Sequence, residues 1–215
     1  MKDKIVLVGG GGHSRVVIDA ILKKGNYSIV GVVDNDPALE EVSDQRVIGD
    51  DSSLLGIFDS GCRKAFICLG SIGNTAIRRK IFVLLKKIGF IIPVISHPGT
   101  IIGNHVEIGE GTFVAPGAVI GTGSKIGRNV IVNTNASLDH DCELGDFVHV
   151  APGCTISGGV VIGNDTHIGL GSCIVEYKSI GANSFIGAGS IVISDMPGDS
   201  KAMGSPCKVV GRWNG

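Results

Sequence analysis

The stretch ISGGVVIGNDTHIGLGSCI, residues 156–174, places an isoleucine at every sixth position. The same spacing continues without interruption in both directions, through Ile102, Ile108, Val114, Ile120, Ile126, Val132, Leu138, Leu144, Val150, Ile156, Ile162, Ile168, Ile174, Ile180, Ile186 and Val192. A helix repeats its apolar positions roughly every 3.6 residues and a strand every second residue, so neither element produces this period. Six-residue repeats are typical of a parallel β-helix, in which three repeats make one triangular coil of about 18 residues.

The other repeat positions fit this interpretation. Glycine often follows the aliphatic residue, where it relieves the backbone at a corner, and small side chains usually stand two residues before it. Each unit would then be a short strand and a tight bend, with the aliphatic side chain inside. About half of the chain is therefore predicted to be a solenoid.

Composition restricts the kind of partner. The chain has 215 residues, 34 glycines, 5% aromatic residues and a formal net charge of -1. It has no long run of Lys or Arg, which argues against nucleic acid or a membrane surface and favours a small molecule. The six cysteines form no CxxC pair, so we expect reduced thiols in the cytoplasm. The apolar run after the charged N-terminus is too short for a signal peptide or a membrane span.

The N-terminal part alternates strands and helices. Strands are predicted over residues 4–8, 28–33, 64–69 and 90–95, and helices after the glycines at 9–12 and over residues 75–87. This order predicts a small, Rossmann-like parallel α/β sheet with its ligand site at the carboxyl ends of the strands. We place this domain at residues 1–96, the β-helix at 97–194 and a C-terminal tail, with a short helix, at 195–215.

Gly9, Gly10, Gly11 and Gly12 lie between the first strand and its helix. Backbone amides there could approach a phosphate, and the helix dipole would favour the anion. The dinucleotide fingerprint is incomplete because Ser14 occupies its last glycine position. The domain is also short for a full dinucleotide, so part of a mononucleotide ligand is preferred; the alternative is a tight turn without a ligand.

Histidines in the repeat array are the candidates for chemistry. His140 and Asp141 follow Leu138, which places them at a corner and facing outward. A neutral imidazole can take a proton from an attacking amine or alcohol, and a carboxylate can fix its tautomer; the alternative is a surface histidine with a chance acidic neighbour. His149 and His167 should stack one coil apart, either as solvated residues or, with a third ligand, as part of a zinc site.

Taken together, these features resemble the left-handed β-helix acyltransferases, and among them the sugar acetyltransferases with an N-terminal nucleotide-sugar-binding domain. The segments that carry the resemblance are Gly9–Ser14, Asn74–Lys80, the uninterrupted array, Asn133–Thr134 with Leu138–Cys142, and Gly204–Lys208. Nearly the whole chain is covered. Cys207 departs from the usual alanine, and residues 71–73 lengthen the loop before Asn74. The left hand of the coil is implied by the resemblance alone.

The resemblance also implies a homotrimer, with acetyl-CoA in the groove between adjacent β-helices and no required metal. His140 would be the general base and Asp141 its acidic partner. Coenzyme contacts are expected at His149, Gly169, Gly187, Pro206 and Lys208. Contacts to the nucleotide sugar are expected at Gly10, Gly11, Gly12, His13, Asp34, Asn35, Gly70, Asn74 and Asn133.

The expected activity is acetyl transfer from acetyl-CoA to the 4-amino group of a UDP- or GDP-linked 4-amino-4,6-dideoxy sugar, by direct attack on the thioester. The closest alternative is O-acetylation of a sialic acid or related sugar. A zinc hydratase on the same fold and a non-catalytic, nucleotide-sensing trimer are further alternatives. Glycan assembly is the expected pathway.

Overall fold

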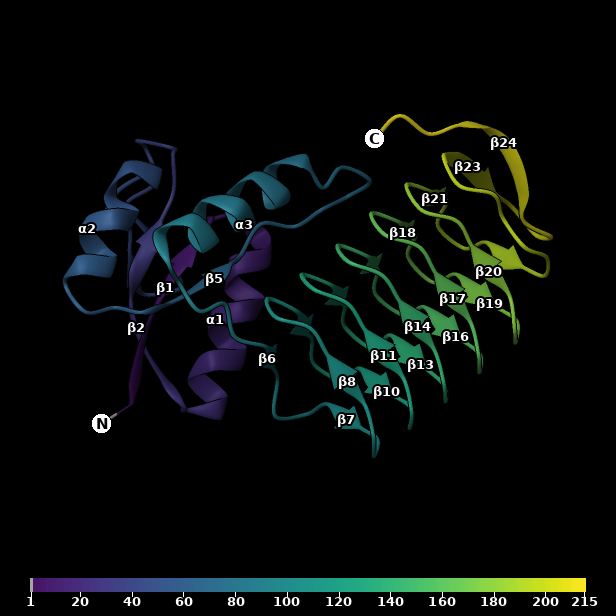
Figure 1. The fold of residues 1–215 in the computed structure, drawn as a ribbon, viewed down its shortest axis with the longest axis horizontal. Helices are drawn as coiled ribbons and strands as arrows, with labels where there is room; N and C mark the ends of the chain where they lie inside the picture. The colour runs from purple at the N-terminus through teal and green to yellow at the C-terminus, as the bar shows by residue number, and fades with distance from the viewer. Residues whose placement is uncertain (1) are drawn as a thin grey trace. The chain divides into compact units, whose positions relative to one another are not determined.

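The computed structural model describes residues 2–215, which form two compact units (Figure 1). The first unit contains residues 2–70 and 76–98. The second contains residues 99–215 together with the short segment 71–75. The chain therefore passes briefly to the second unit before the sequence-based boundary at residue 96. Within residues 2–215, no helix combines the length and the apolar character that a membrane crossing needs.

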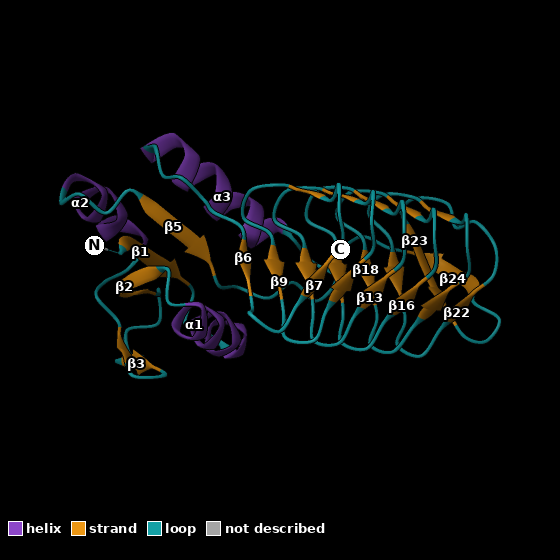
Figure 2. Cartoon of the chain, turned by 90° about the horizontal axis from the view of Figure 1, so that it is seen from below, coloured by secondary structure: helices purple, strands orange, loops and turns teal. Residues whose placement is uncertain are grey.

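The first unit is a parallel sheet with helices on both faces, as the alternating sequence pattern predicts. The sheet has the order β2-β1-β5. Val6, Ala65 and Ile67 share one apolar cluster with Leu54 and Leu85, so α2 and α3 pack on one face, and α1 lies on the other side in Figure 2. The elements are β1 (Asp3–Val8), α1 (Gly12–Lys24), β2 (Tyr27–Val33), β5 (Lys64–Ile67), α2 (Leu54–Asp59) and α3 (Ala76–Ile88).

Shorter elements of the first unit differ from the prediction. The expected strand at 90–95 is reduced to a bridge between Ile91 and Lys64, followed by β6 (Ile95–Ser96). Pro93 interrupts the strand because it has no N–H to donate to a ladder. The sequence pattern also missed α2, the hairpin of β3 (Glu41–Val42) and β4 (Gln45–Arg46), and the 3-10 turn η1 (Asp51–Ser53).

The second unit is the predicted solenoid. Its strands, each of two residues except β23, pair in parallel in three sheets, which we call faces 1, 2 and 3. Face 1 comprises β7 (Ile101–Ile102), β10 (Val119–Ile120), β13 (Ser137–Leu138), β16 (Thr155–Ile156), β19 (Cys173–Ile174) and β22 (Ile191–Val192). Face 2 comprises β8 (Glu107–Ile108), β11 (Lys125–Ile126), β14 (Glu143–Leu144), β17 (Val161–Ile162) and β20 (Ser179–Ile180). Face 3 comprises β9 (Phe113–Val114), β12 (Ile131–Val132), β15 (His149–Val150), β18 (His167–Ile168), β21 (Phe185–Ile186) and β23 (Ser200–Met203).

Coils stack in a register of 18 residues. Ile156 pairs with Leu138 above it and with Ile174 below it, and all three are 1% exposed. Burying one such side chain contributes about 1.5–3 kcal/mol. Small polar residues add bonds between coils, as where the Ser124 hydroxyl donates to the Asp139 carbonyl (3.2 Å) and accepts from the Cys142 amide (3.1 Å). The sixfold period therefore reflects both apolar and polar contacts.

The C-terminal tail is a strand, not the expected short helix. β24 (Lys208–Arg212) pairs antiparallel with β23. Pairing with the last open edge of face 3 satisfies backbone groups of both strands, and the two valines of the segment also favour a strand over a helix.

Face 3 carries a column of aromatic side chains on its outside. The rings of His149 and His167 are 4.9 Å apart between centroids, His167 stacks on Phe185 at 5.0 Å, and Phe185 stacks on Trp213 at 4.6 Å. The stacking of His149 on His167 confirms their predicted alignment one coil apart. Neither is solvated, however, because they are only 7% and 6% exposed.

Residues 71–75 form a strap over this column. The Ser71 carbonyl lies 2.6 Å from His149 Nδ1, and the Gly73 carbonyl accepts a hydrogen bond from Trp213 Nε1 at 3.1 Å. Thr75 donates to Asp165 Oδ1 at 2.6 Å. Gly73 has φ +71°, and a Cβ there would lie 2.6 Å from the Trp213 ring, so a side chain would lift the strap. These contacts bury the two histidines.

Burial lowers the pKa of His167, and the neighbouring His149 adds to this effect, so that the pKa is about 4. The folded protein therefore keeps His167 neutral at a pH where an unfolded chain would bind a proton. In the unfolded chain the pKa of His167 is near 6.5. The contribution of His167 to the free energy of unfolding is therefore fully present above pH 6.5 and is lost as the pH falls toward 4.

Gly127 tests the close stacking of the coils. A Cβ at this position would lie 2.6 Å from the Gly145 carbonyl carbon of the next coil. We expect Gly127→Ala to lower the free energy of unfolding by about 2 kcal/mol, measured by urea denaturation. The control is Gly153→Asn, at an open corner with φ +68°, a conformation that asparagine tolerates. Equal stability of the two variants would contradict this account of the stacking.

His167 tests the burial under the strap. We expect the free energy of unfolding to fall by about 3 kcal/mol from this group between pH 6.5 and 4, because His167 gains a proton in the unfolded chain while the buried ring stays neutral. His167→Phe should remove most of this loss and keep the stacking. The control, His105→Gln at an exposed corner, should leave the pH dependence unchanged. Urea denaturation at several pH values across this range measures the free energy of unfolding. If that free energy depends on pH in His167→Phe as it does in the parent, the pH dependence does not come from His167.

Candidate functional site

His140 lies at the corner between faces 1 and 2. Its imidazole Nδ1 is 2.9 Å from Asp141 Oδ2, and its side chain is 47% exposed. The Asp141 backbone has φ +55°, a left-handed conformation that aspartate tolerates better than most residues. The tight corner therefore turns the carboxylate toward the ring that precedes it. The His140 and Asp141 side chains meet as the sequence predicts.

The hydrogen bond assigns the tautomer of His140. An ionised carboxylate can only accept, so Nδ1 carries the proton and Nε2 keeps its lone pair. The bond from Asp141 raises the pKa of His140 above its ordinary value, with a smaller contribution from the charge of Asp139. The imidazole is therefore an oriented, somewhat strengthened base that faces solvent.

Gly158, which sequence reasoning missed, supports this ring from the next coil. A Cβ on Gly158 would lie 2.5 Å from His140 Nε2, so only glycine leaves room for the imidazole there. The neighbouring amides of Gly159 and Tyr177 donate to the His140 and Gly158 carbonyls at 2.9 and 3.0 Å. Within residues 2–215 the Gly158 amide makes no such backbone bond. The sequence did contain a signal for Gly158. It is 18 residues after His140, which is the length of one coil, so the two residues stack.

Asn133 and His149 lie elsewhere on the coil. Asn133 Nδ2 is 3.2 Å from His149 Nε2. Asn133 lies at the corner between faces 3 and 1, and His149 lies on face 3. That face lies opposite the corner of His140 in the triangular coil. The structure brings Asn133 and His149 together but separates them from His140 within one chain.

The residues predicted to contact coenzyme fall into two groups. Gly169 and Gly187 are buried at the corner between faces 3 and 1, and a Cβ on Gly169 would lie 2.5 Å from the backbone of the next coil. Pro206 and Lys208 are exposed, in the turn between β23 and β24 and at the start of β24. The glycines have a stacking role, while Pro206 and Lys208 are accessible to a ligand.

In the first unit, the four glycines have different roles. Gly9 (φ +104°) and Gly10 are packed, since a Cβ would lie 2.7 Å from Leu69 and 2.2 Å from Leu39. Gly11 and Gly12 have no atom within 4 Å of an added Cβ. They cap and begin α1, whose first amides have no partner within the helix. The open half of the loop, with His13 behind it, suits an anion.

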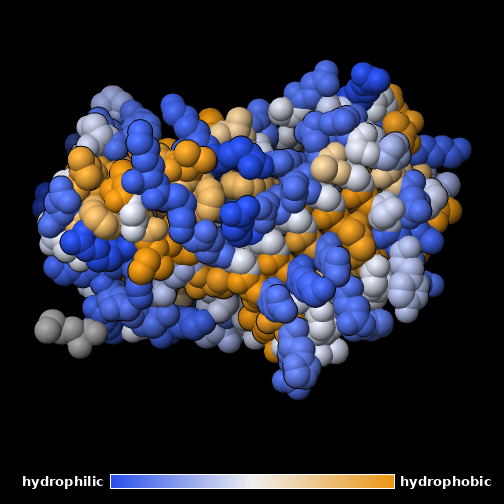
Figure 3. All heavy atoms as spheres, in the orientation of Figure 1, coloured by the Kyte–Doolittle hydropathy of each residue, from blue (hydrophilic) through white to orange (hydrophobic). Residues whose placement is uncertain are grey.

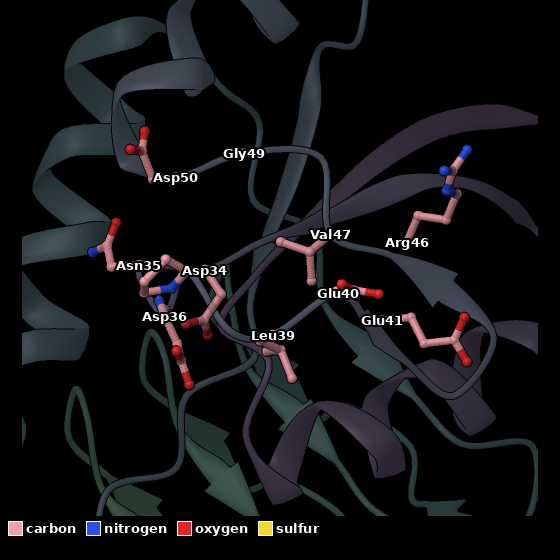
Figure 4. Close-up of a pocket in the computed structure, with 11 residues that line it drawn as sticks. Asp34, Asn35, Asp36, Leu39, Glu40, Glu41, Arg46, Val47, Gly49 and Asp50 are labelled. Carbon is pink, nitrogen blue, oxygen red and sulfur yellow. Dashed lines mark hydrogen bonds between the residues drawn. The ribbon is translucent and has the colours of Figure 1, made fainter.

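Asp34 and Asn35 follow β2, next to this loop. The Asp34 carboxylate accepts from the Gly10 amide at 2.6 Å and the Asp36 amide at 2.8 Å. Asn35 and Asp51 exchange two hydrogen bonds, at 3.0 and 3.1 Å. Asp34 therefore fixes the glycine loop as well as facing the cleft of about 720 Å³ in Figure 4, in which Asp34, Asn35 and Asp36 line one side and Glu41 and Arg46 the other.

A second cavity, of about 350 Å³, lies where the three strands of this sheet end. Gly9, Asp34 and Leu69 follow β1, β2 and β5, and Lys80 of α3 adds a cation. This is the carboxyl edge at which open parallel sheets bind ligands. Gly70 is exposed, and a Cβ on it would lie 3.9 Å from the Cβ of His13, so these two residues meet. Asn74 instead belongs to the strap of the second unit.

Arg78 holds the end of β5 in place and was not predicted to do so. It is 2% exposed, and its guanidinium donates to the carbonyls of Leu69 and Ile67. Burial lowers its pKa to about 10, so the group stays charged at neutral pH. Charged hydrogen bonds to carbonyls are a usual way to satisfy such a buried cation.

The zinc alternative finds no ligand set within residues 2–215, where no three His, Cys, Asp or Glu side chains gather as a metal site would require. His149 and His167 are neighbours, but His140 lies on another corner. All six cysteines are free thiols, and only Cys173 is exposed.

Comparisons with known proteins agree with this architecture. The model of the PglD N-terminal domain matches residues 4–85, and the model of the bacterial transferase hexapeptide, with six repeats, matches residues 123–158. A search of curated proteins found no match.

Solved structures match along nearly the entire chain. PerB from Caulobacter crescentus, in complex with CoA and GDP-perosamine, is 35% identical, with a TM-score of 0.90 over 96% of this chain and 97% of that one. A variant of perosamine N-acetyltransferase from the same organism, with a histidine replaced by asparagine, is 34% identical with a TM-score of 0.91 over 96% of each chain. The acetyltransferase domain of PglB from Neisseria gonorrhoeae FA1090, in complex with acetyl coenzyme A, is 33% identical with a TM-score of 0.88 over 98% and 100%. The chain therefore belongs to the left-handed β-helix, hexapeptide-repeat sugar acetyltransferases that carry an N-terminal domain of the PglD type.

Proposed function

We propose that this protein transfers acetyl from acetyl-CoA to the 4-amino group of a nucleotide-linked 4-amino-4,6-dideoxy sugar. The observation that carries the proposal is the His140–Asp141 pair, held at an exposed corner above the Gly158 amide. The relatives with solved structures support the substrate class, since they include complexes with CoA and GDP-perosamine. Two of them carry a single histidine substitution, to asparagine or alanine.

His140 acts as the general base. The neutral amine attacks the thioester carbonyl carbon, and His140 Nε2 takes a proton from the amine nitrogen as the C–N bond forms. The Nδ1–H bond to Asp141 stabilises the imidazolium that results. When the tetrahedral intermediate collapses, the C–S bond breaks and the proton passes to the CoA sulfur. No covalent acyl-enzyme is needed.

The Gly158 amide is our candidate for stabilising the oxyanion. It lies at the coil below His140, beside the Nε2 atom where the reacting amine must be. An amide fixed by the stacked coils loses little entropy when negative charge develops on the carbonyl oxygen.

The cysteines do not supply a nucleophile in this scheme. Cys142 is the thiol nearest to His140 in the sequence, but it is buried and donates to the Ser157 carbonyl at 3.3 Å. Burial raises the pKa of its thiol, which disfavours the thiolate. Direct transfer to the amine is the simpler course.

The first unit would hold the sugar nucleotide. The open N-terminal turn of α1 at Gly11 and Gly12, with His13 next in the chain, suits its diphosphate, and the cavity beside Asp34, Asn35 and Lys80 suits the base or ribose. The nucleotide is GDP in the Caulobacter complex. We propose GDP or UDP here, and a cytoplasmic place for the reaction because nucleotide sugars and acetyl-CoA are made there.

A homotrimer would complete the site. His140 lies opposite Asn133 and His149 on the coil, so one chain cannot bring these groups together, whereas two adjacent chains can. Ile101, Val161 and Ile191 are 66%, 45% and 40% exposed on faces 1 and 2, and Figure 3 shows hydrophobic side chains gathered in rows over the solenoid. Acetyl-CoA would lie between such faces, near Pro206 and Lys208.

Replacement of His140 tests the base. We expect His140→Ala to lower kcat by about 100-fold or more with saturating substrates, because general-base catalysis contributes about 10²–10⁴-fold. Release of the CoA thiol measures the rate. His105→Ala, at another exposed position of the same corner, is the control. Turnover of His140→Ala close to that of the parent protein would contradict the role.

Replacement of Asp141 tests its effect on the base. The raised pKa of His140 places the acidic limb of the rate profile above the ordinary histidine value, because activity needs the neutral ring. Asp141→Asn removes the carboxylate that favours the imidazolium, so the acidic limb should move to lower pH while kcat falls. A profile of kcat/KM against pH measures this, and an unmoved limb would contradict the pairing.

An acceptor panel tests the substrate class. Thiol release should be fastest with GDP- or UDP-linked 4-amino-4,6-dideoxy sugars, and slower by orders of magnitude with the matching 4-hydroxy sugars. Free sialic acid is included to detect O-acetylation. Faster release with sialic acid than with every amino sugar would overturn the proposal in favour of an O-acetyltransferase.

A further inference from the structure

Tyr177 lies on the same corner of the solenoid as His140, two coils further along. The pairs at this corner are Asn104–His105, Thr122–Gly123, His140–Asp141, Gly158–Gly159 and Glu176–Tyr177. The Tyr177 amide donates to the Gly158 carbonyl at 3.0 Å, as the Gly159 amide does to the His140 carbonyl at 2.9 Å. Coils are spaced by about 4.8 Å, so one pair of glycines separates the two aromatic rings.

The two rings lean toward this pair from opposite sides. A Cβ on Gly158 would lie 2.5 Å from His140 Nε2, and a Cβ on Gly159 would lie 2.5 Å from Tyr177 Cδ1. Of the five pairs at this corner, Gly158–Gly159 alone has no side chain. The glycines thus form a short floor, with the imidazole at one end and the phenol at the other.

The fold itself gives no reason for a tyrosine here. Tyr177 has φ +54°, a left-handed conformation that glycine, asparagine and aspartate adopt at least cost. Phe147 has a similar φ of +60°, but it is 3% exposed, so burial compensates for its strain. Tyr177 is 71% exposed. An exposed aromatic residue held in a strained conformation points to a role in binding.

From this geometry we propose that Tyr177 positions the thioester end of acetyl-CoA over the Gly158–Gly159 floor. The inference rests on the proposed acetyl transfer, since the reacting carbonyl must lie near His140 Nε2 and the Gly158 amide. The sulfur and the first methylenes of the coenzyme arm then lie along the glycines, against the phenol ring. The ring supplies apolar contact at little entropic cost because it has only two torsions.

The test compares two substitutions at this position. Tyr177→Asn relieves the backbone but removes the ring, whereas Tyr177→Phe keeps the ring. We expect Tyr177→Asn to raise the KM for acetyl-CoA and the Kd for CoA about tenfold, the size of effect expected from one aromatic contact. Its kcat and its KM for the sugar should change less than threefold, and its melting temperature should equal or exceed that of the parent. Tyr177→Phe should bind CoA within about twofold of the parent.

The control is Val83→Asn, which changes another exposed apolar residue, 59% exposed on α3 in the first unit. It should leave CoA binding unchanged. An unchanged Kd for CoA in Tyr177→Asn would overturn the proposal. So would a change in the oligomeric mass of that variant, measured by light scattering, since Tyr177 would then serve contacts between chains.

Calorimetry with CoA alone keeps this test separate from the proposed function. The binding measurement needs no acceptor, so it decides the role of Tyr177 even if the amino-sugar panel gives no turnover. If the parent protein turns over the amino sugars and Tyr177→Asn binds CoA as tightly as the parent, the proposed function stands and the role of Tyr177 is rejected.

Discussion

The structure depends on one constraint, the stacking of each coil on the next at a spacing of 18 residues. The aliphatic ladder fills the interior, and hydrogen bonds between coils fix the register. Any residue therefore has its neighbours at sequence offsets of 18 in both directions. A site on this scaffold is a column of residues spaced 18 apart in the sequence, and His140, Gly158 and Glu176 form one such column. A rigid column suits catalysis, because the groups need little rearrangement as the reaction proceeds.

This constraint explains what could be predicted. The period of six predicts the coils, their inward ladder and the outward corner that carries His140 with Asp141, because these depend only on spacing. The same arithmetic would have found Gly158 and Tyr177, had it been applied to the corner pairs. The alignment of His149 with His167 also follows from spacing, but their burial does not, since it depends on a strap that is outside the repeat.

The rest could not be predicted because it depends on tertiary contacts. Segment 71–75 has no periodicity, and only its hydrogen bonds to His149, Trp213 and Asp165 show where it lies. The tail forms β24 because an unpaired edge of face 3 is available to it, and the sequence pattern does not show that edge. In the first unit, Asp34 was expected to face a ligand, yet its carboxylate also binds the Gly10 amide. Sequence indicates which residues are near a site more readily than which partner each one has.

The antiparallel pairing of β24 with β23 affects how the protein can associate with other copies of itself at high concentration. A parallel solenoid exposes a ladder of backbone groups at its last coil, to which the first coil of another molecule could add, and so on without limit. A strand of reversed direction at that edge breaks the pattern, since the next coil would have to pair with a backbone running the wrong way. β24 thus closes the edge of face 3 to a further parallel coil.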